Sequence, residues 1–180
     1  KCVVPPKELH RICIIEKRHL NGRNVFTLKP KEHFSGKRVL YLHGGAYVQN
    51  FVRQHWNFLG MLVKHLHCEV VAPDYPLAPQ HTCKDAFAMA EVLYRETVSL
   101  ADPHNLILMG DSAGGGFALA LAQKMKCENT EQPGQIILLS PWLDITLKNP
   151  EIKAIDAIDP FLGISGLQKA GKAYAGDADP

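Results

Sequence analysis

Gly110-Asp111-Ser112-Ala113-Gly114 indicates the fold class, because it stands between a short apolar run and a segment of small residues. The run Leu106-Ile107-Leu108-Met109 predicts a buried strand, and residues 113–125 predict a helix. A G-x-S-x-G pattern between a strand and a helix is that of a nucleophile elbow, a sharp turn that holds a serine clear of the backbone. Gly110 and Gly114 suit such a turn, because a side chain at either position would clash across it.

A second segment, His43-Gly44-Gly45-Ala46, follows the apolar run of residues 39–42, which predicts another buried strand. Its glycines allow the backbone to approach a substrate closely. We expect Ser112 to attack a carbonyl, and the N–H groups of Gly44, Gly45 and Ala113 to hold the oxyanion that the attack creates. One such donor typically contributes about 3 kcal/mol of transition-state stabilisation.

The neighbouring residues of both segments are expected to support this chemistry. We predict that His43 orients the loop through its ring nitrogens and is not a general base. Asp111 is expected at the helix start or as a supporting acid, not as a catalytic carboxylate. A glycine-rich phosphate loop is the rival interpretation of residues 110–116, and the absence of a following G-K-[ST] disfavours it.

Strands that alternate with helices after an initial hairpin predict an α/β fold. Residues 10–18 and 23–29 read as strands around the turn Asn21-Gly22, whose residues tolerate positive φ. Helices are predicted over 54–66, from a capping box at Thr82 to about Leu100, and from a cap at Ser165 through Tyr174, with further strands at 69–72 and 135–139. We therefore expect one domain over residues 1–180, with a mostly parallel sheet, an N-terminal antiparallel hairpin and helices on both faces.

Composition excludes several classes of function. The chain has 46% hydrophobic and 21% charged residues, as in a globular protein, and a net charge of +2 without a dense basic block, which disfavours a nucleic-acid partner. No apolar run is long enough to span a bilayer. His65, His67 and Cys68 have no second ligand pair at zinc spacing, so we expect no metal. Five cysteines without a C-x-x-C pair favour a reducing compartment and hence a cytoplasmic location.

Four segments in order resemble the hormone-sensitive-lipase-like branch of the α/β-hydrolases, which includes bacterial acetyl esterases and carboxylesterases. They are His43-Gly44-Gly45-Ala46, Asp74-Tyr75-Pro76-Leu77-Ala78-Pro79, Gly110-Asp111-Ser112-Ala113-Gly114-Gly115 and Ser140-Pro141-Trp142-Leu143-Asp144. The resemblance covers about residues 35–180. It implies an α/β-hydrolase fold, hydrolysis of short-chain carboxylic esters through an acyl-enzyme on Ser112, and no cofactor. Proteins of this branch often dimerise, so it also allows a homodimer.

The sequence departs from the family pattern in three places. Ala46 replaces a third glycine, and Pro76 replaces the usual arginine, so we expect any ion pair made there to be absent. The family order of the catalytic residues is Ser, Asp, His, and no histidine follows His104.

Three apolar residues are candidates to line the pocket for the acyl or alcohol group of the substrate: Tyr47, Phe161 and Leu162. For Phe161 we favour a role in core packing.

Two interpretations of the missing histidine stay open. In the first, residues 1–180 are the front of a longer esterase whose last strands carry the acid and the base, and this stretch alone is inactive or very weak. An unpaired strand at 135–139 favours that interpretation, since exposed strand edges aggregate. In the second, the protein is a non-catalytic small-ligand-binding protein on the same fold. The first residue is Lys1 rather than Met, so it need not be the start of the gene product.

Overall fold

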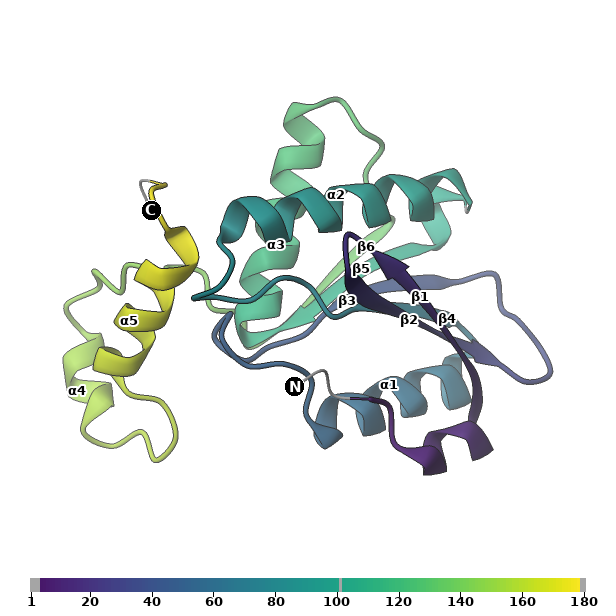
Figure 1. Ribbon diagram of the computed structural model, residues 1–180, viewed down its shortest axis with the longest axis horizontal. Coiled ribbons are helices and arrows are strands. Elements are labelled where there is room, and N and C mark those ends of the chain that lie inside the picture. The colour runs from purple at the N-terminus through teal and green to yellow at the C-terminus, as the bar shows by residue number, and fades with distance from the viewer. Residues whose placement is uncertain (1–3, 101, 179–180) are drawn as a thin grey trace.

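A single sheet with helices on both faces forms the centre of the computed structural model, which describes residues 4–100 and 102–178 (Figure 1). The strands lie in the order β1-β2-β4-β3-β5-β6. Their bounds are β1 Cys13–Leu20, β2 Arg23–Pro30, β3 Arg38–Leu42, β4 Glu69–Pro73, β5 Leu106–Asp111 and β6 Gln135–Leu139. The helices are α1 Arg53–Leu66, α2 Cys83–Ser99, α3 Ser112–Cys127, α4 Ile152–Asp156 and α5 Ile164–Ala175, with short 3-10 turns η1 Lys7–Arg11 and η2 Pro103–Asn105.

The N-terminal hairpin is confirmed. β1 and β2 pair antiparallel, and Asn21 (φ 50°) and Gly22 (φ 75°) make the turn between them. The first strand begins at Cys13 and not at residue 10 as predicted, because residues 7–11 form η1 and bury Leu9. β2 pairs antiparallel with β4, and the remaining neighbours pair parallel, so the mostly parallel α/β sheet is also confirmed.

Each face of the sheet has its own core. On one face α1 buries Trp56, whose ring meets Phe26 edge-on at 5.2 Å and stacks on Phe51 at 4.4 Å. On the other face α2 and α3 bury a larger cluster that includes Phe117 and Tyr94. Figure 1 shows α1 below the sheet and α2 and α3 above it. This two-sided burial explains why the central strands read as continuous apolar runs.

The strand order brings the two sequence motifs together. β3 lies between β4 and β5 in the sheet. After β3 the chain continues through α1 to β4 on one side of β3, and β5 pairs with β3 on its other side. Leu42 and Gly110 are partners in the β3–β5 register. The segments that follow them, His43–Ala46 and the elbow, therefore emerge side by side at the carboxyl ends of parallel strands, where open α/β sheets bind ligands.

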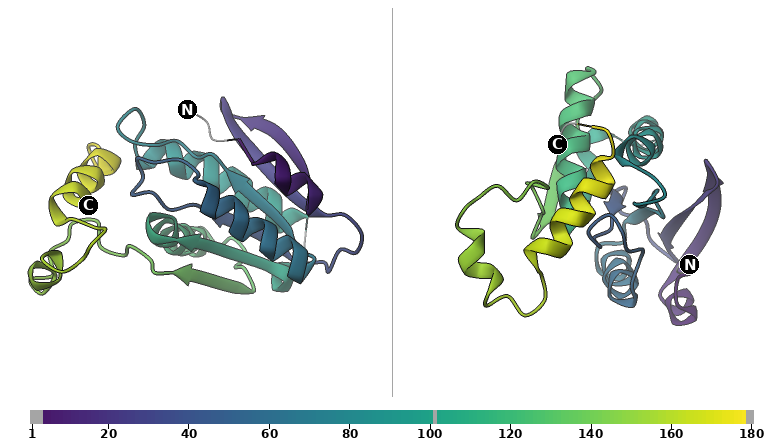
Figure 2. Two further views of the ribbon diagram at one scale, coloured as in Figure 1. Left: turned by 90° about the horizontal axis from the view of Figure 1, so that it is seen from below. Right: turned by 60° about the vertical axis from the view of Figure 1, so that its left-hand side comes forward.

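The segment after β6 carries α4 and α5 beyond the carboxyl ends of the strands (Figures 1 and 2). The predicted cap at Ser165 is wrong, because α5 begins at Ile164 with Gly163 at the cap position. The core role favoured for Phe161 is also wrong, since its side chain is 91% exposed. Tyr174 of α5 contacts the loop after β3: its ring stacks on the ring of Tyr47, with 3.7 Å between the ring centroids.

Two features bear on the expectations from composition. Cys13, Cys68, Cys83 and Cys127 are free thiols, whereas Cys2 lies outside the described residues. Within residues 4–100 and 102–178, no helix has the length and apolar character needed to cross a membrane.

Candidate active site

The elbow places Ser112 at the junction of β5 and α3 in a backbone conformation rare for a residue with a side chain, with φ 49°. A Cβ atom at Gly110 would lie 2.2 Å from the Gly114 carbonyl oxygen, and one at Gly114 would lie 2.0 Å from the Leu42 oxygen. Both glycines are therefore required by the turn, because a side chain at either position would clash with backbone atoms across it. Ser112 as a residue is half-buried.

The loop after β3 is a second strained segment beside the elbow. Gly45 (φ 123°), Ala46 (φ 52°) and Tyr47 (φ 62°) all have positive φ, and the Gly45 carbonyl accepts hydrogen bonds from the Val48 and Gln49 N–H groups. A Cβ atom at Gly45 would lie 2.5 Å from the Gln49 oxygen. Three consecutive residues in this region turn the peptide planes sharply, and their N–H groups belong to neither a strand nor a helix.

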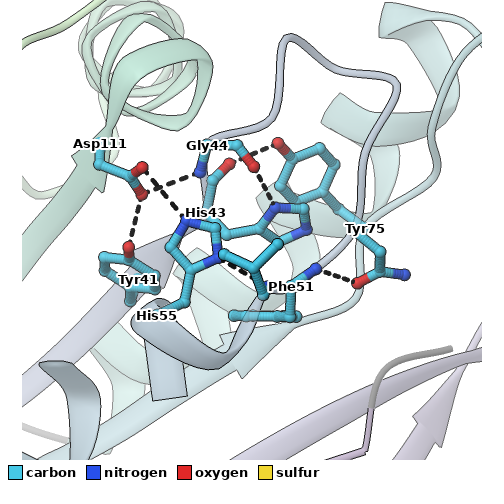
Figure 3. A network of polar contacts seen from close by, with 9 residues as sticks. Tyr41, His43, Gly44, Phe51, His55, Tyr75 and Asp111 are labelled. Carbon is cyan, nitrogen blue, oxygen red and sulfur yellow. Dashed lines mark hydrogen bonds and ion pairs between the residues drawn. The ribbon is translucent and has the colours of Figure 1, made fainter. Parts of the chain in front are cut away.

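Asp111 joins the loop to the elbow (Figure 3). Its Oδ1 accepts hydrogen bonds from the Tyr41 hydroxyl at 2.5 Å and from the Gly44 N–H at 2.8 Å, and its Oδ2 lies 3.3 Å from His55 Nε2. Its side chain makes no capping bond to α3. The Gly44 N–H, expected from the sequence to face an oxyanion, thus donates to Asp111 instead. In this geometry it is not an available donor.

Donors remain at three other backbone positions. Among the described residues, no hydrogen bond is formed by the Gly45 or Ala46 N–H groups. The Ala113 N–H belongs to the first turn of α3, where helix N–H groups have no partner within the helix. These groups, with the positive end of the helix dipole, are the ones that can hold a developing negative charge.

The charge of Asp111 is stabilised in place. Burial raises the pKa of this carboxyl, but hydrogen bonds from His55 and Tyr41, the nearby imidazole and the Gly44 N–H outweigh it, so the pKa lies below its usual value. Burial and the hydrogen bond to Asp111 raise the pKa of the Tyr41 hydroxyl. Tyr41 therefore donates and Asp111 accepts across the neutral pH range.

His43 is fully buried beneath the loop. Its Nδ1 lies 2.7 Å from the Gly44 carbonyl oxygen, which can only accept, so Nδ1 carries the proton. The ring stacks on Tyr75 at 4.4 Å, and the Tyr75 hydroxyl donates to the His43 carbonyl at 2.6 Å. Burial lowers the pKa of His43 to about 4, so the ring is neutral at pH 7. A buried, neutral ring bound to its own loop orients that loop and does not suit a general base.

A buried ion pair lies two residues before Pro76. Asp74, which is 1% exposed, pairs with Arg23 at 2.7 Å, and the Arg23 guanidinium also donates to the Asp74 and Tyr75 carbonyls. The expectation concerned an ion pair made by residue 76, and the pair seen here does not involve Pro76: β2 supplies the guanidinium from a distant part of the sequence. The pairing holds the segment that carries Tyr75 against β2.

An apolar pocket of about 270 Å³ lies next to the loop and α3. Tyr47 lines it together with Phe117, Trp142 and Tyr174, whereas Phe161 and Leu162 do not. The Trp142 N–H donates to the Ser112 carbonyl at 2.8 Å, which places the start of the segment after β6 beside the elbow. Within the part of the chain that the structure describes, no three His, Cys, Asp or Glu side chains are grouped to hold a metal ion.

Sequence reasoning missed three members of this site: Tyr41, His55 and Arg23. Tyr41 reads as one more apolar residue of a buried strand, and His55 as a polar residue of an amphipathic helix. Both contact Asp111, to which only the folded chain brings them. No local pattern in the sequence could have identified them.

Comparisons with known proteins agree with this geometry. Residues 39–180 match the family described as alpha/beta hydrolase fold. An esterase of Acinetobacter venetianus is 33% identical over 140 residues, which cover 77% of this chain and 46% of the esterase. Human hormone-sensitive lipase is 25% identical over 164 residues, covering 87% of this chain and 15% of the lipase.

A solved structure of an esterase from the bacterial hormone-sensitive lipase family superposes with a TM-score of 0.85 and 26% identity, covering 94% of this chain and 57% of that one. The chain thus spans about half the length of the Acinetobacter esterase, or less in the case of the human lipase. The predicted resemblance is confirmed, and the chain belongs to the α/β hydrolase fold family, in its hormone-sensitive-lipase-like branch.

Proposed function

We propose that the protein is a serine esterase that hydrolyses short-chain carboxylic esters through an acyl-enzyme on Ser112. One observation carries the proposal: Ser112 has φ 49° at a strand–helix junction, in register beside a loop with three consecutive positive φ values. Strain of this kind persists where it has a use, and its use here is to hold a hydroxyl and several backbone N–H groups around one point. The names of the relatives, esterase and lipase, support the same reaction.

The reaction follows from these groups. Ser112 Oγ adds to the ester carbonyl carbon as a general base takes its proton, and the carbonyl oxygen becomes an oxyanion. The N–H groups of Gly45, Ala46 and Ala113 stabilise that oxyanion. The C–O bond to the alcohol breaks, the alcohol leaves with a proton, and water then hydrolyses the acyl-enzyme. The apolar pocket of about 270 Å³ is not lined by Ser112 but reaches Gly116, one turn further along α3, and we expect a small acyl or alcohol group to occupy it.

The two histidines beside the loop do not suit the role of base. His43 is buried with Nδ1 bound to Gly44, and His55 is engaged at both ring nitrogens. Because the matched relatives are about twice as long as the matched stretch or longer, the assay should use the longest natural form of the protein.

The test is hydrolysis of p-nitrophenyl acetate and butyrate by that form and by Ser112→Ala. We expect the substitution to lower kcat by at least about 10³-fold, because it removes the attacking atom. Ser99→Ala is the matched control, since Ser99 is an exposed serine at the far end of α2. Equal activity of Ser112→Ala and the control would refute the proposal. Absence of turnover in the parent protein, with retained binding of the ester, would favour a non-catalytic binding protein.

A further inference from the structure

We propose that His55 is a positioning residue for this reaction: it fixes the Asp111 carboxylate, and through Asp111 the Gly44 amide, so that the loop after β3 stays aligned with Ser112. The inference rests on the proposed esterase function. It assigns a role to a helix residue outside the sequence motifs.

Three elements meet at one carboxylate (Figure 3). Asp111 directly precedes Ser112, Gly44 begins the strained loop, and His55 lies in the first turn of α1. A Cβ atom at Gly44 would lie 2.3 Å from Asp111 Oδ2, so the loop and the carboxylate are in close contact. A rotation of the carboxylate therefore alters the contact that joins the loop to the elbow.

The hydrogen bonds of His55 indicate which of its ring nitrogens carries the proton. The Val52 N–H donates to His55 Nδ1 at 3.1 Å, so Nδ1 has no proton. The proton of the neutral ring is then on Nε2, which donates it to Asp111 Oδ2 at 3.3 Å. The two ring nitrogens thus have separate roles, because Nδ1 accepts at the start of α1 and Nε2 holds the carboxylate.

The two carboxylate oxygens are held differently. Oδ1 accepts from both Tyr41 and Gly44, whereas in the described residues His55 is the only side chain that donates to Oδ2. The His55 ring is itself confined, with the Phe51 ring edge-on at 5.9 Å and the Tyr41 ring at 6.3 Å. Without the Nε2 donor the carboxylate can rotate toward solvent, because its side chain is 25% exposed, and the Gly44 bond loosens with it.

Two substitutions separate positioning from a structural role. In His55→Asn the amide oxygen stands at the position of Nδ1 and can still accept from Val52, but nothing reaches Asp111. In His55→Gln the amide nitrogen stands at the position of Nε2 and can still donate to Asp111, but the bond to Val52 is lost. Each variant therefore keeps one of the two hydrogen bonds of His55 and loses the other.

We expect His55→Asn to lower kcat for p-nitrophenyl butyrate about tenfold and to leave KM within about twofold of the parent value. Misaligned oxyanion donors stabilise the transition state less well, whereas substrate binding does not depend on them. Its Tm should stay near that of the parent. His55→Gln should keep kcat within about threefold and lose a few degrees of Tm through the weakened helix start. All variants are made in the longest natural form of the protein.

Two results would overturn the inference: kcat of His55→Asn equal to that of the parent, or kcat falling in both variants in proportion to Tm. A second readout does not need turnover. The Gly44 amide proton, bound to a carboxylate, should shift upfield in the NMR spectrum of His55→Asn but not of His55→Gln, and an unchanged shift in both would also contradict it. If Ser112→Ala retains activity, the esterase proposal fails, while the amide shift still tests the His55 contact.

Discussion

The elbow and the segment after β6 differ in how closely their residues are constrained. Around the elbow, Gly110 and Gly114 have no room for a methyl group, and Phe117 is 1% exposed. In the segment after β6, a Cβ atom at Gly166 would meet nothing within 4 Å, and Phe161 is 91% exposed. Replacing a glycine or a phenylalanine should therefore change the stability of the protein differently in the two regions. The same substitution can be made in both regions and compared.

The largest contrast is expected between two helical glycines. Gly114→Ala should destabilise the protein by about 3 kcal/mol or more, because the new methyl group would lie 2.0 Å from the Leu42 oxygen and 2.5 Å from the His43 oxygen. Gly166→Ala in α5 should instead stabilise it by up to about 1 kcal/mol, as alanine is the better helix former. Urea unfolding measures both, and similar effects of the two changes would contradict the contrast.

Two phenylalanines give the next contrast. Phe117→Ala should cost about 4 kcal/mol, because the ring fills the core between Tyr75 at 5.3 Å and Phe87 at 4.8 Å. Phe161→Ala should change stability by less than about 0.5 kcal/mol, since it is a surface substitution. Thermal and urea unfolding of the two variants provide the comparison. A cost above about 2 kcal/mol for Phe161→Ala would show that this side chain is covered in the whole protein.

A smaller effect is expected from the buried imidazole under the loop. Burial lowers the pKa of His43 to about 4 from 6.5, so the unfolded chain takes up the proton first as the pH falls. Stability from this group is fully present above about pH 6.5 and is lost progressively toward pH 4, by about 3 kcal/mol at most.

Urea unfolding between pH 7.5 and 4.5 tests this effect. His43→Gln should flatten the acid slope relative to the parent, whereas His104→Gln, at an exposed position of η2, should leave it unchanged. The slopes are compared rather than the absolute stabilities, because His43→Gln also removes packing. An acid slope that is the same in all three proteins would contradict the assignment.

Local patterns predicted most of the fold. The Asn21-Gly22 turn, the apolar runs of β3 and β5 and the helices α1 to α3 each depend on residues near one another in sequence. Errors arose where distant parts of the chain determine the environment. Phe161 is apolar, but the segment that carries it stands away from the sheet. The error at Ser165 is of a different kind, a local shift of the cap position by two residues to Gly163.

The site was predictable only in part for the same reason. The glycine pattern identifies the elbow, because the turn itself excludes side chains. The direction of the Gly44 N–H depends on Asp111, which is 67 residues away, and the ion pair of Asp74 depends on Arg23, which is 51 residues away. Contacts of this kind arise from strand order and register, which motifs do not encode.

Covalent labelling of Ser112 is the sharpest experiment on the proposed nucleophile. The longest natural form of the protein is treated with a p-nitrophenyl alkylphosphonate, and the modified peptide is located by mass spectrometry. We expect one adduct on Ser112, formed in step with the loss of esterase activity and absent from Ser112→Ala. Inactivation with the adduct on another residue, or undiminished labelling of Ser112→Ala, would show that Ser112 is not the nucleophile.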